Sequence, residues 1–146
     1  GIKEVWVFSS KPFEFLTSKE DHVKKIKAAV RDNLKNEVSY TYFVSHSEFK
    51  LDDINNLIPD KNSPLRSYIE VIFVDSKYFK TFFTLHFKGN QELESVYMSA
   101  LLPHRNDLMI QVSNPDHIKR IKERIQKLKG EHSKSDKVKI IDYTVR

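Results

Sequence analysis

The chain has 146 residues, 39% hydrophobic and 12% aromatic, which is enough for one domain with its own core. Its 25 Lys and Arg outnumber its 20 acidic residues, and the net charge of +5 allows an anionic partner without requiring one. The absence of cysteine excludes disulfides, thiolate metal sites and cysteine nucleophiles. With only three glycines, neither a P-loop nor a G-x-G-x-x-G dinucleotide motif can be written. No apolar run approaches the roughly 18 residues that span a bilayer.

The first half of the chain predicts a parallel βαβ unit. Residues 4–9, EVWVFS, are typical of a strand that is buried on both faces. Ser18 is a suitable cap for a helix, with Asp21 completing a capping box. The apolar stripe of that helix consists of Val23, Ile26, Val30 and Leu34. Residues 39–45, SYTYFVS, then form a second strand, which the βαβ order places parallel to the first.

A third strand follows two short connections. Residues 51–58 predict a short helix that stops at Pro59, and residues 60–66 predict a loop. The strong strand is YIEVIFVD, residues 68–75.

The pattern then changes to strict alternation, which is typical of antiparallel strands. Residues 81–88, TFFTLHFK, place Phe and Leu on one face. Gly89-Asn90 predicts a turn into a strand over 95–102, and a further turn at 104–107 leads to a strand over 108–113.

The last helix has clear boundaries. Asn114 is a good N-cap, Pro115 suits the first helical position, and Gly130 is expected to end the helix. The apolar stripe consists of Ile118, Ile121, Ile125 and Leu128. A polar linker over 131–137 then leads to a last strand over 138–145, which either completes the sheet or connects to another domain.

These elements define an α/β (α+β) fold: a mixed sheet with a βαβ half, an antiparallel meander and a C-terminal amphipathic helix, with helices packed on the sheet. We expect residues 1–146 to form a single domain, cut from a longer cytoplasmic protein and therefore linked to neighbouring domains. No membrane association and no cofactor are expected. The six histidines are scattered, so no metal site is expected either.

The first candidate chemistry lies in TLHFKGN, residues 84–90. Strand alternation places His86 and Lys88 on one face, about 7 Å apart along the strand. An imidazole nucleophile beside an ammonium group suits attack on a phosphodiester. The pair resembles the H-x-K core of the phospholipase D superfamily. That family pattern requires Asp at position 93, which is Leu93 here. It also requires two copies of H-x-K, of which a homodimer could supply the second, but a homodimer would not supply the missing acid.

Two longer segments carry a broader resemblance. Residues 30–44, VRDNLKNEVSYTYFV, and residues 106–128, NDLMIQVSNPDHIKRIKERIQKL, are similar to segments of phospholipase-D-like effector domains of bacterial multidomain regulators. Such domains often follow a helix–turn–helix and are frequently without catalytic residues. The resemblance implies a sensory domain.

A third indication comes from the strand ends. In open parallel sheets, ligands bind beyond the carboxyl ends of the strands. The polar residues at these ends, which suit a small polar or anionic ligand, are Ser9, Ser10, Ser45, His46 and Asp75. The alternative is that they only satisfy the backbone of the turns.

The C-terminal helix is a candidate surface for nucleic acid. Its cations are Lys119, Arg120, Lys122, Arg124, Lys127 and Lys129, of which we single out Lys119, Lys122 and Lys129 for phosphate contacts. A solvated helix face is the alternative.

Together these observations favour a non-catalytic regulatory or ligand-sensing domain. The alternatives are a dimeric phosphodiesterase or nuclease of the phospholipase D type, with His86 and Lys88 as catalytic residues, and a nucleic-acid-binding module.

Overall fold

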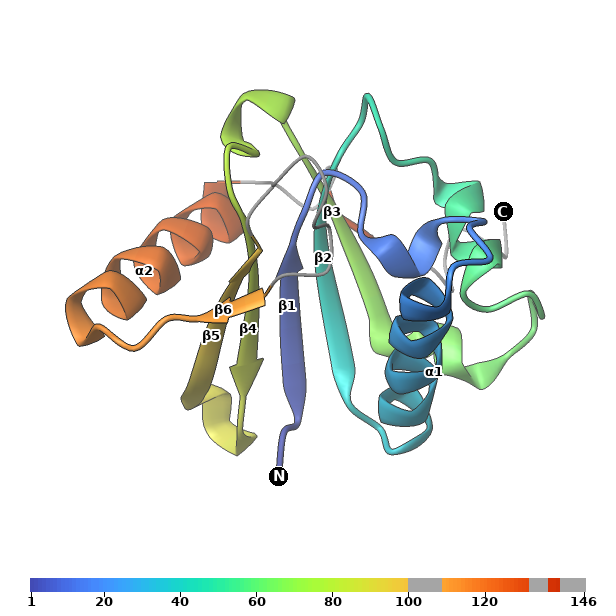
Figure 1. The fold of residues 1–146 in the computed structure, drawn as a ribbon, viewed down its shortest axis with the longest axis horizontal. Helices are drawn as coiled ribbons and strands as arrows, with labels where there is room; N and C mark the ends of the chain where they lie inside the picture. Colours follow the sequence, from blue (N-terminus) through green and yellow to red (C-terminus); the bar gives the residue numbers. More distant parts are fainter. Residues whose placement is uncertain (100–108, 132–136, 140–146) are drawn as a thin grey trace.

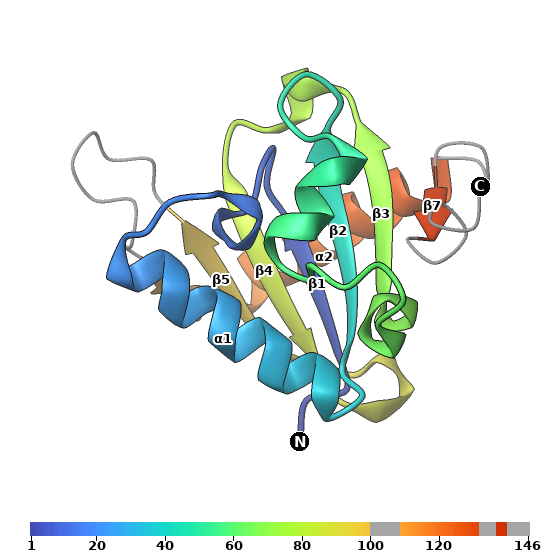
Figure 2. The ribbon, with the colours of Figure 1, turned by 90° about the vertical axis from the view of Figure 1, so that its right-hand side faces the viewer.

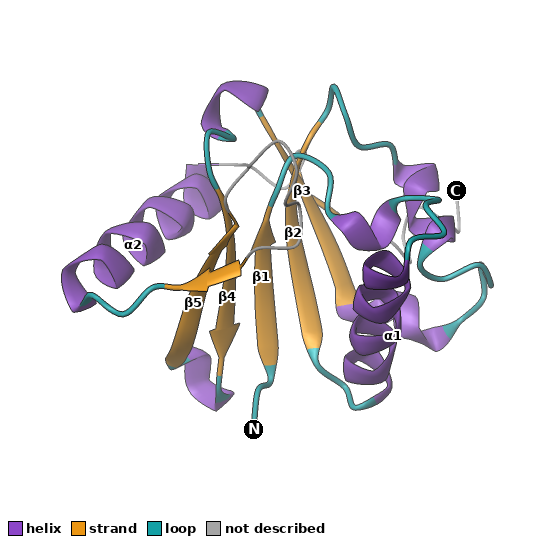
Figure 3. Ribbon diagram, viewed as in Figure 1, coloured by secondary structure: helices purple, strands orange, loops and turns teal. Residues whose placement is uncertain are grey.

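The computed structural model describes residues 1–99, 109–131 and 137–139. In these ranges the chain forms a seven-stranded mixed sheet with helices on both faces, which confirms the predicted α/β class (Figures 1 and 3). The strand order is β6-β5-β4-β1-β2-β3-β7. None of the described helices is long and apolar enough to cross a membrane.

The parallel half of the sheet consists of β1 (Glu4–Phe8), β2 (Ser39–Ser45) and β3 (Ile69–Val74). The pairs β1–β2 and β2–β3 are parallel, as predicted. Because these strands are parallel, their carboxyl ends meet at one edge of the sheet, which is uppermost in Figure 1. In open α/β sheets, ligands bind at this edge.

The antiparallel meander adds three strands on the other side of β1. They are β4 (Phe82–Phe87), β5 (Leu93–Ser99) and β6 (Met109–Gln111). β4 pairs with β1 and β5, and β5 pairs with β6, all antiparallel. The predicted Gly89-Asn90 turn is confirmed, with Asn90 in the left-handed region at φ 64°.

Parts of the predicted second half lie outside the described residues. The turn over 104–107 and the end of the strand over 95–102 lie outside them, as does most of the strand over 138–145. The described part of that last strand is β7 (Lys137–Lys139), which pairs antiparallel with β3. β7 therefore completes the sheet at its far edge.

The helices form a layer on each face of the sheet. α1 (Asp21–Lys35) covers one face together with short 3-10 helices, and α2 (Pro115–Glu131) covers the other (Figure 2). The predicted apolar stripes of both helices face the sheet. Three short 3-10 helices join α1 on its side: Phe13–Phe15, Leu51–Asn56 and Pro64–Tyr68.

Strand alternation divides the core into two parts. The core on the α1 side includes Val5, Val7, Phe15, Leu34, Tyr42, Val44, Phe49 and Val71. The core on the α2 side includes Trp6, Phe8, Phe43, Ile72, Leu85, Phe87, Val96, Ile125 and Leu128. β1 contributes to both cores, as expected for a strand that is buried on both faces.

Three details of the prediction are wrong. α1 begins at Asp21 after Glu20, because the Ser18 hydroxyl accepts the Glu20 N–H (3.2 Å) in the preceding turn instead of capping the helix. Gly130 lies inside α2, which continues to Glu131. The predicted loop over 60–66 ends in a 3-10 helix that starts at Pro64, capped by the Ser63 hydroxyl.

The turn after α1 contains an unfavourable backbone conformation. Glu37 adopts φ 64° while its N–H donates to Leu34 O and the Val38 N–H donates to Asn33 O, both at 3.0 Å. This is the Schellman arrangement, whose left-handed position is usually occupied by glycine. A glutamate there lacks the tolerance of glycine for positive φ.

We predict that Glu37→Gly stabilises the protein by about 0.5–1 kcal/mol, because relief of the strain exceeds the entropic cost of glycine. Asn90→Gly is the matched comparison, since Asn already tolerates φ 64° and should gain less. Urea unfolding measures both. A Glu37→Gly variant that is less stable than wild type would contradict the prediction.

The core on the α1 side also contains a buried carboxyl group. The Tyr42 hydroxyl donates to Glu14 Oε2 (2.9 Å), and Glu14 is only 6% exposed. Burial raises the pKa of Glu14, although its hydrogen bonds act in the opposite direction. Folding therefore favours the protonated form of Glu14.

This predicts that the free energy of unfolding falls as pH rises through the folded-state pKa of Glu14, because the contribution is complete only below the unfolded-state value. Glu14→Gln keeps an acceptor for Tyr42 and should lack this fall. Urea unfolding of both proteins from pH 4 to pH 8 measures the difference. Parallel pH profiles would contradict the prediction.

Candidate functional site

The predicted ligand residues lie at the carboxyl edge of the parallel strands, and backbone hydrogen bonds bring the first two strand ends together. The Ser9 N–H donates to Phe43 O, and the Ser45 N–H donates to Ser10 O, both at 3.1 Å. Ser9 and Ser45 are buried. Backbone hydrogen bonds therefore hold these two strand ends in place.

Two side chains at this edge contribute to turns. The Ser45 hydroxyl accepts the Ser47 N–H (3.2 Å) and lies 2.8 Å from the Ser47 hydroxyl. Asp75 is exposed, and its carboxylate accepts the Lys77 N–H (2.9 Å). Part of their hydrogen-bonding capacity is thus used locally. A role for these residues in ligand binding stays a prediction.

His46 lies in an open hollow on the α1 side of this edge. Its ring stacks on Phe73, with centroids 4.1 Å apart and planes 9° apart. The hollow has a volume of about 370 Å³ and is lined by His46, Phe49, Lys50, Leu51, Asp52 and Phe73. The ammonium of Lys50 donates to His46 O (3.3 Å), so it is already engaged. Of the five predicted ligand residues, only His46 lines this hollow.

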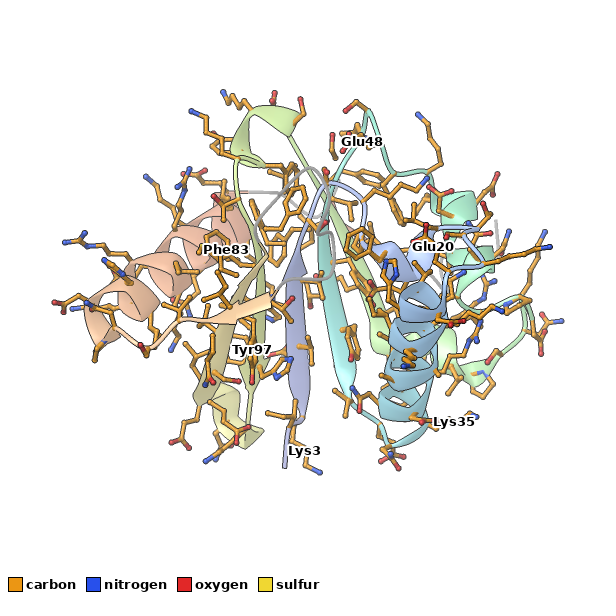
Figure 4. The ribbon with its side chains drawn as sticks, in the orientation of Figure 1. Lys3, Glu20, Lys35, Glu48, Phe83 and Tyr97 are labelled. Atoms are coloured by element: carbon orange, nitrogen blue, oxygen red, sulfur yellow. The ribbon has the colours of Figure 1, made fainter. Side chains whose placement is uncertain are left out.

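A second, smaller hollow lies on the α2 side of the same edge, with a volume of about 140 Å³. Its apolar lining consists of Phe8, Phe83, Ile121, Ile125 and Leu128. Its polar lining consists of Tyr78, Lys80, Thr81, Arg120 and Arg124. Phe8 and Phe83 are direct partners in the β1–β4 ladder, and Phe83 extends from β4 on the side of α2 (Figure 4). We call this feature the α2 hollow.

The α2 hollow lies where the strand order changes direction. From β1 the chain continues to β2 and β3 on one side, and then returns to place β4 on the other side of β1. Because β4 runs antiparallel to β1, the carboxyl end of β1 lies beside the start of β4 at this edge. The floor of the hollow contains the β1–β4 pair itself.

The rim of the α2 hollow is basic. Arg120 and Arg124 are exposed and one turn apart on α2, and Lys80 is exposed in the connection before β4. Within the described part of the chain, the ion pairs are Lys11–Asp53, His22–Glu20 and Lys127–Glu131. None of the three rim cations belongs to them, so all three are available to an anion.

His86 lies on the opposite face of the sheet from the α2 hollow, because it pairs with Val5, which faces α1. It is half-buried, with its ring 5.2 Å from the Tyr97 ring. The strand register shifts between His86 and Phe87, and Lys88 is exposed beyond the end of β4. Leu93, where the phospholipase D pattern requires Asp, packs against the core on the α2 side.

The three lysines predicted to contact nucleic acid differ in their environments. Lys119 is exposed and Lys122 is half-exposed, whereas the ammonium of Lys129 lies 4.6 Å from the centroid of the Trp6 ring. That cation–π contact assigns Lys129 a structural role on the sheet. Binding of nucleic acid by this helix stays a prediction.

The residues that line the α2 hollow were not predicted as a site. Phe8 and Phe83 look like ordinary core residues in the sequence, and Arg120 and Arg124 look like part of a uniformly basic helix. The signal that distinguishes them is the helical position next to the apolar stripe, which places these two arginines beside Ile121 and Ile125. The pairing of β1 with β4 is not visible locally.

The comparisons with known proteins add no homologue. No family model, curated protein or solved structure matches the chain. The resemblance to phospholipase-D-like effector domains therefore stays a hypothesis. Among the described residues, no three His, Asp or Glu side chains gather in a way that could hold a metal ion.

Burial lowers the pKa of His86, an effect only partly offset by Glu94. We predict that its imidazole titrates below the ordinary value of 6.5 and is neutral at pH 7. An NMR pH titration, with the resonance assigned by its loss in His86→Gln, measures the midpoint. A midpoint at or above 6.5 would contradict the prediction.

Proposed function

We propose that this chain is a non-catalytic, ligand-sensing regulatory domain of a larger protein and that it binds a small anion in the α2 hollow. The observation that carries the proposal is a set of three cations, Lys80, Arg120 and Arg124, that have no ion-pair partner among the described residues. They surround an apolar floor where β1 pairs with β4. Guanidinium groups pair with carboxylates and phosphates through two parallel hydrogen bonds.

The chemistry of the lining supports binding rather than turnover. Among the described residues that line the α2 hollow there is no carboxylate and no imidazole, the groups that most often transfer protons in hydrolysis. The imidazole of His86 belongs to the opposite face of the sheet. The phosphodiesterase alternative would therefore need a different site from the one with the basic rim.

The position of α2 in the fold supports a role in sensing. α2 follows β6 at one edge of the sheet and precedes β7 at the other edge. A ligand in the hollow touches α2 and the β1–β4 pair together, so it favours one position of the helix relative to the sheet. A shift of α2 would move the connections to both edge strands, which is a route to a neighbouring domain.

We predict that small anions bind to this hollow and that Arg120→Gln with Arg124→Gln weakens binding about tenfold or more, because charge-assisted hydrogen bonds contribute about 1.5–3 kcal/mol. The probes are phosphate, sulfate, acetate, benzoate and phenyl phosphate. Binding is measured from chemical-shift changes in ¹H–¹⁵N spectra.

The matched control is Lys119→Gln with Lys127→Gln, which removes the same charge from the same helix outside the hollow. It should change affinity less than twofold beyond the general salt effect. Absence of binding by every anion, or equal losses in the two double variants, would refute the proposal. Circular dichroism confirms that all variants fold.

A further inference from the structure

We infer that the anion of the α2 hollow carries a single six-membered aromatic ring, so that the ligand class is a monocyclic aromatic anion, for which benzoate is the probe. This inference rests on the proposed function, because it takes the α2 hollow as the ligand site. It specifies the chemistry of the part of the ligand that lies on the apolar floor of the hollow.

The size of the hollow limits the body of the ligand. Its volume is about 140 Å³, and five apolar side chains line it. A protein cavity of about 150 Å³ lined by Leu, Ile and Phe stays dry and binds benzene. The apolar part of the α2 hollow resembles that cavity in volume and in side-chain type, although the hollow also has a polar, open rim. We therefore expect it to accommodate one ring more closely than two fused rings.

The lining also favours an aromatic ring over an alkyl group. Phe8 in the floor already makes tilted aromatic contacts, with Phe79 at 4.6 Å and Phe43 at 5.9 Å between centroids. Phe83 lies beside Phe8 in the ladder and is only half-buried, so part of its ring remains to be covered. Aromatic pairs in tilted or offset arrangements gain energy beyond that of area burial.

The arrangement of charge orients the ligand. Ile125 and Leu128 are buried, whereas Arg120 and Arg124 are exposed at the mouth. A ring therefore enters the apolar floor first, and its anionic group stays at the rim, where the guanidinium groups can pair with it while remaining hydrated. A neutral ring leaves the cations without a partner, and a small inorganic anion leaves the floor uncovered.

The test compares five probes by ¹H–¹⁵N titration of the full 146-residue chain. The probes are benzoate, acetate (charge without ring), benzyl alcohol (ring without charge), cyclohexanecarboxylate (a non-planar ring) and 2-naphthoate (two rings). We expect benzoate to bind about tenfold or more tightly than acetate, benzyl alcohol and 2-naphthoate, and more tightly than cyclohexanecarboxylate.

A filling variant locates the ring. Ile121→Phe adds volume inside the hollow and should weaken benzoate binding about tenfold while acetate binding changes little. Ile118→Phe is the matched control, because Ile118 lies on the same stripe of α2 and does not line the hollow. Equal effects of the two variants on benzoate would refute the placement of the ring, and thermal unfolding verifies that both remain folded.

The outcomes separate this inference from the proposed function. If acetate and phosphate bind as tightly as benzoate and lose affinity in the arginine double variant, the anion site stands and the aromatic ring is refuted. If none of the charged probes binds, the proposed function and this inference both fail. If benzyl alcohol binds as tightly as benzoate, the ring is retained and the requirement for a negative charge is refuted.

Discussion

The double-sided burial of β1 is the constraint on which the rest of the structure depends. Val5 and Val7 face α1, while Trp6 and Phe8 face α2, and all four are buried. A strand of this kind is stable only in the middle of a sheet with a layer on each face. β2 and β4 supply its neighbours, and the two helices supply the layers. β1 is therefore fully paired and buried only when both halves of the sheet are formed.

The cationic side chains of the two helix layers differ in their hydrogen-bond partners. On the α1 side, cationic side chains donate hydrogen bonds to backbone carbonyls. Arg31 donates to Leu57 O (2.7 Å), and the buried Arg66 donates to Ile58 O and Asp60 O. Lys27 likewise donates to Leu16 O. Each of these donors therefore has an acceptor, and the hydrogen bonds fasten the connecting segments on that face. On the α2 side the rim cations have no such acceptor among the described residues, so their charges are not compensated there.

Sequence patterns predicted most elements because their signals are local. The alternation in β4, the stripe of α2 and the Asn114 cap, whose side chain accepts the N–H of Asp116 (2.9 Å), depend only on neighbouring residues. The carboxyl edge of the parallel strands was also predictable, since their parallel order fixes it, and both hollows lie there. The α2 hollow itself was not predictable, because it requires Phe8 to pair with Phe83, and register between distant strands is a property of the whole sheet.

The same charges that define the α2 hollow also explain why the core does not close over it. Phe8, Ile125 and Leu128 are buried, yet Phe83 and Ile121 remain half-exposed, at a cost of about 25 cal/mol for each Å² of apolar surface left in water. Tighter packing of α2 would recover part of that energy, but it would also draw Arg120 and Arg124 toward the floor and desolvate two unpaired guanidinium groups. Burying an unpaired charge costs several kcal/mol, more than one or two half-exposed side chains can return. A ligand that covered the apolar floor and neutralised the rim would remove both penalties together, which is why the ligand that we propose combines an apolar body with a negative charge.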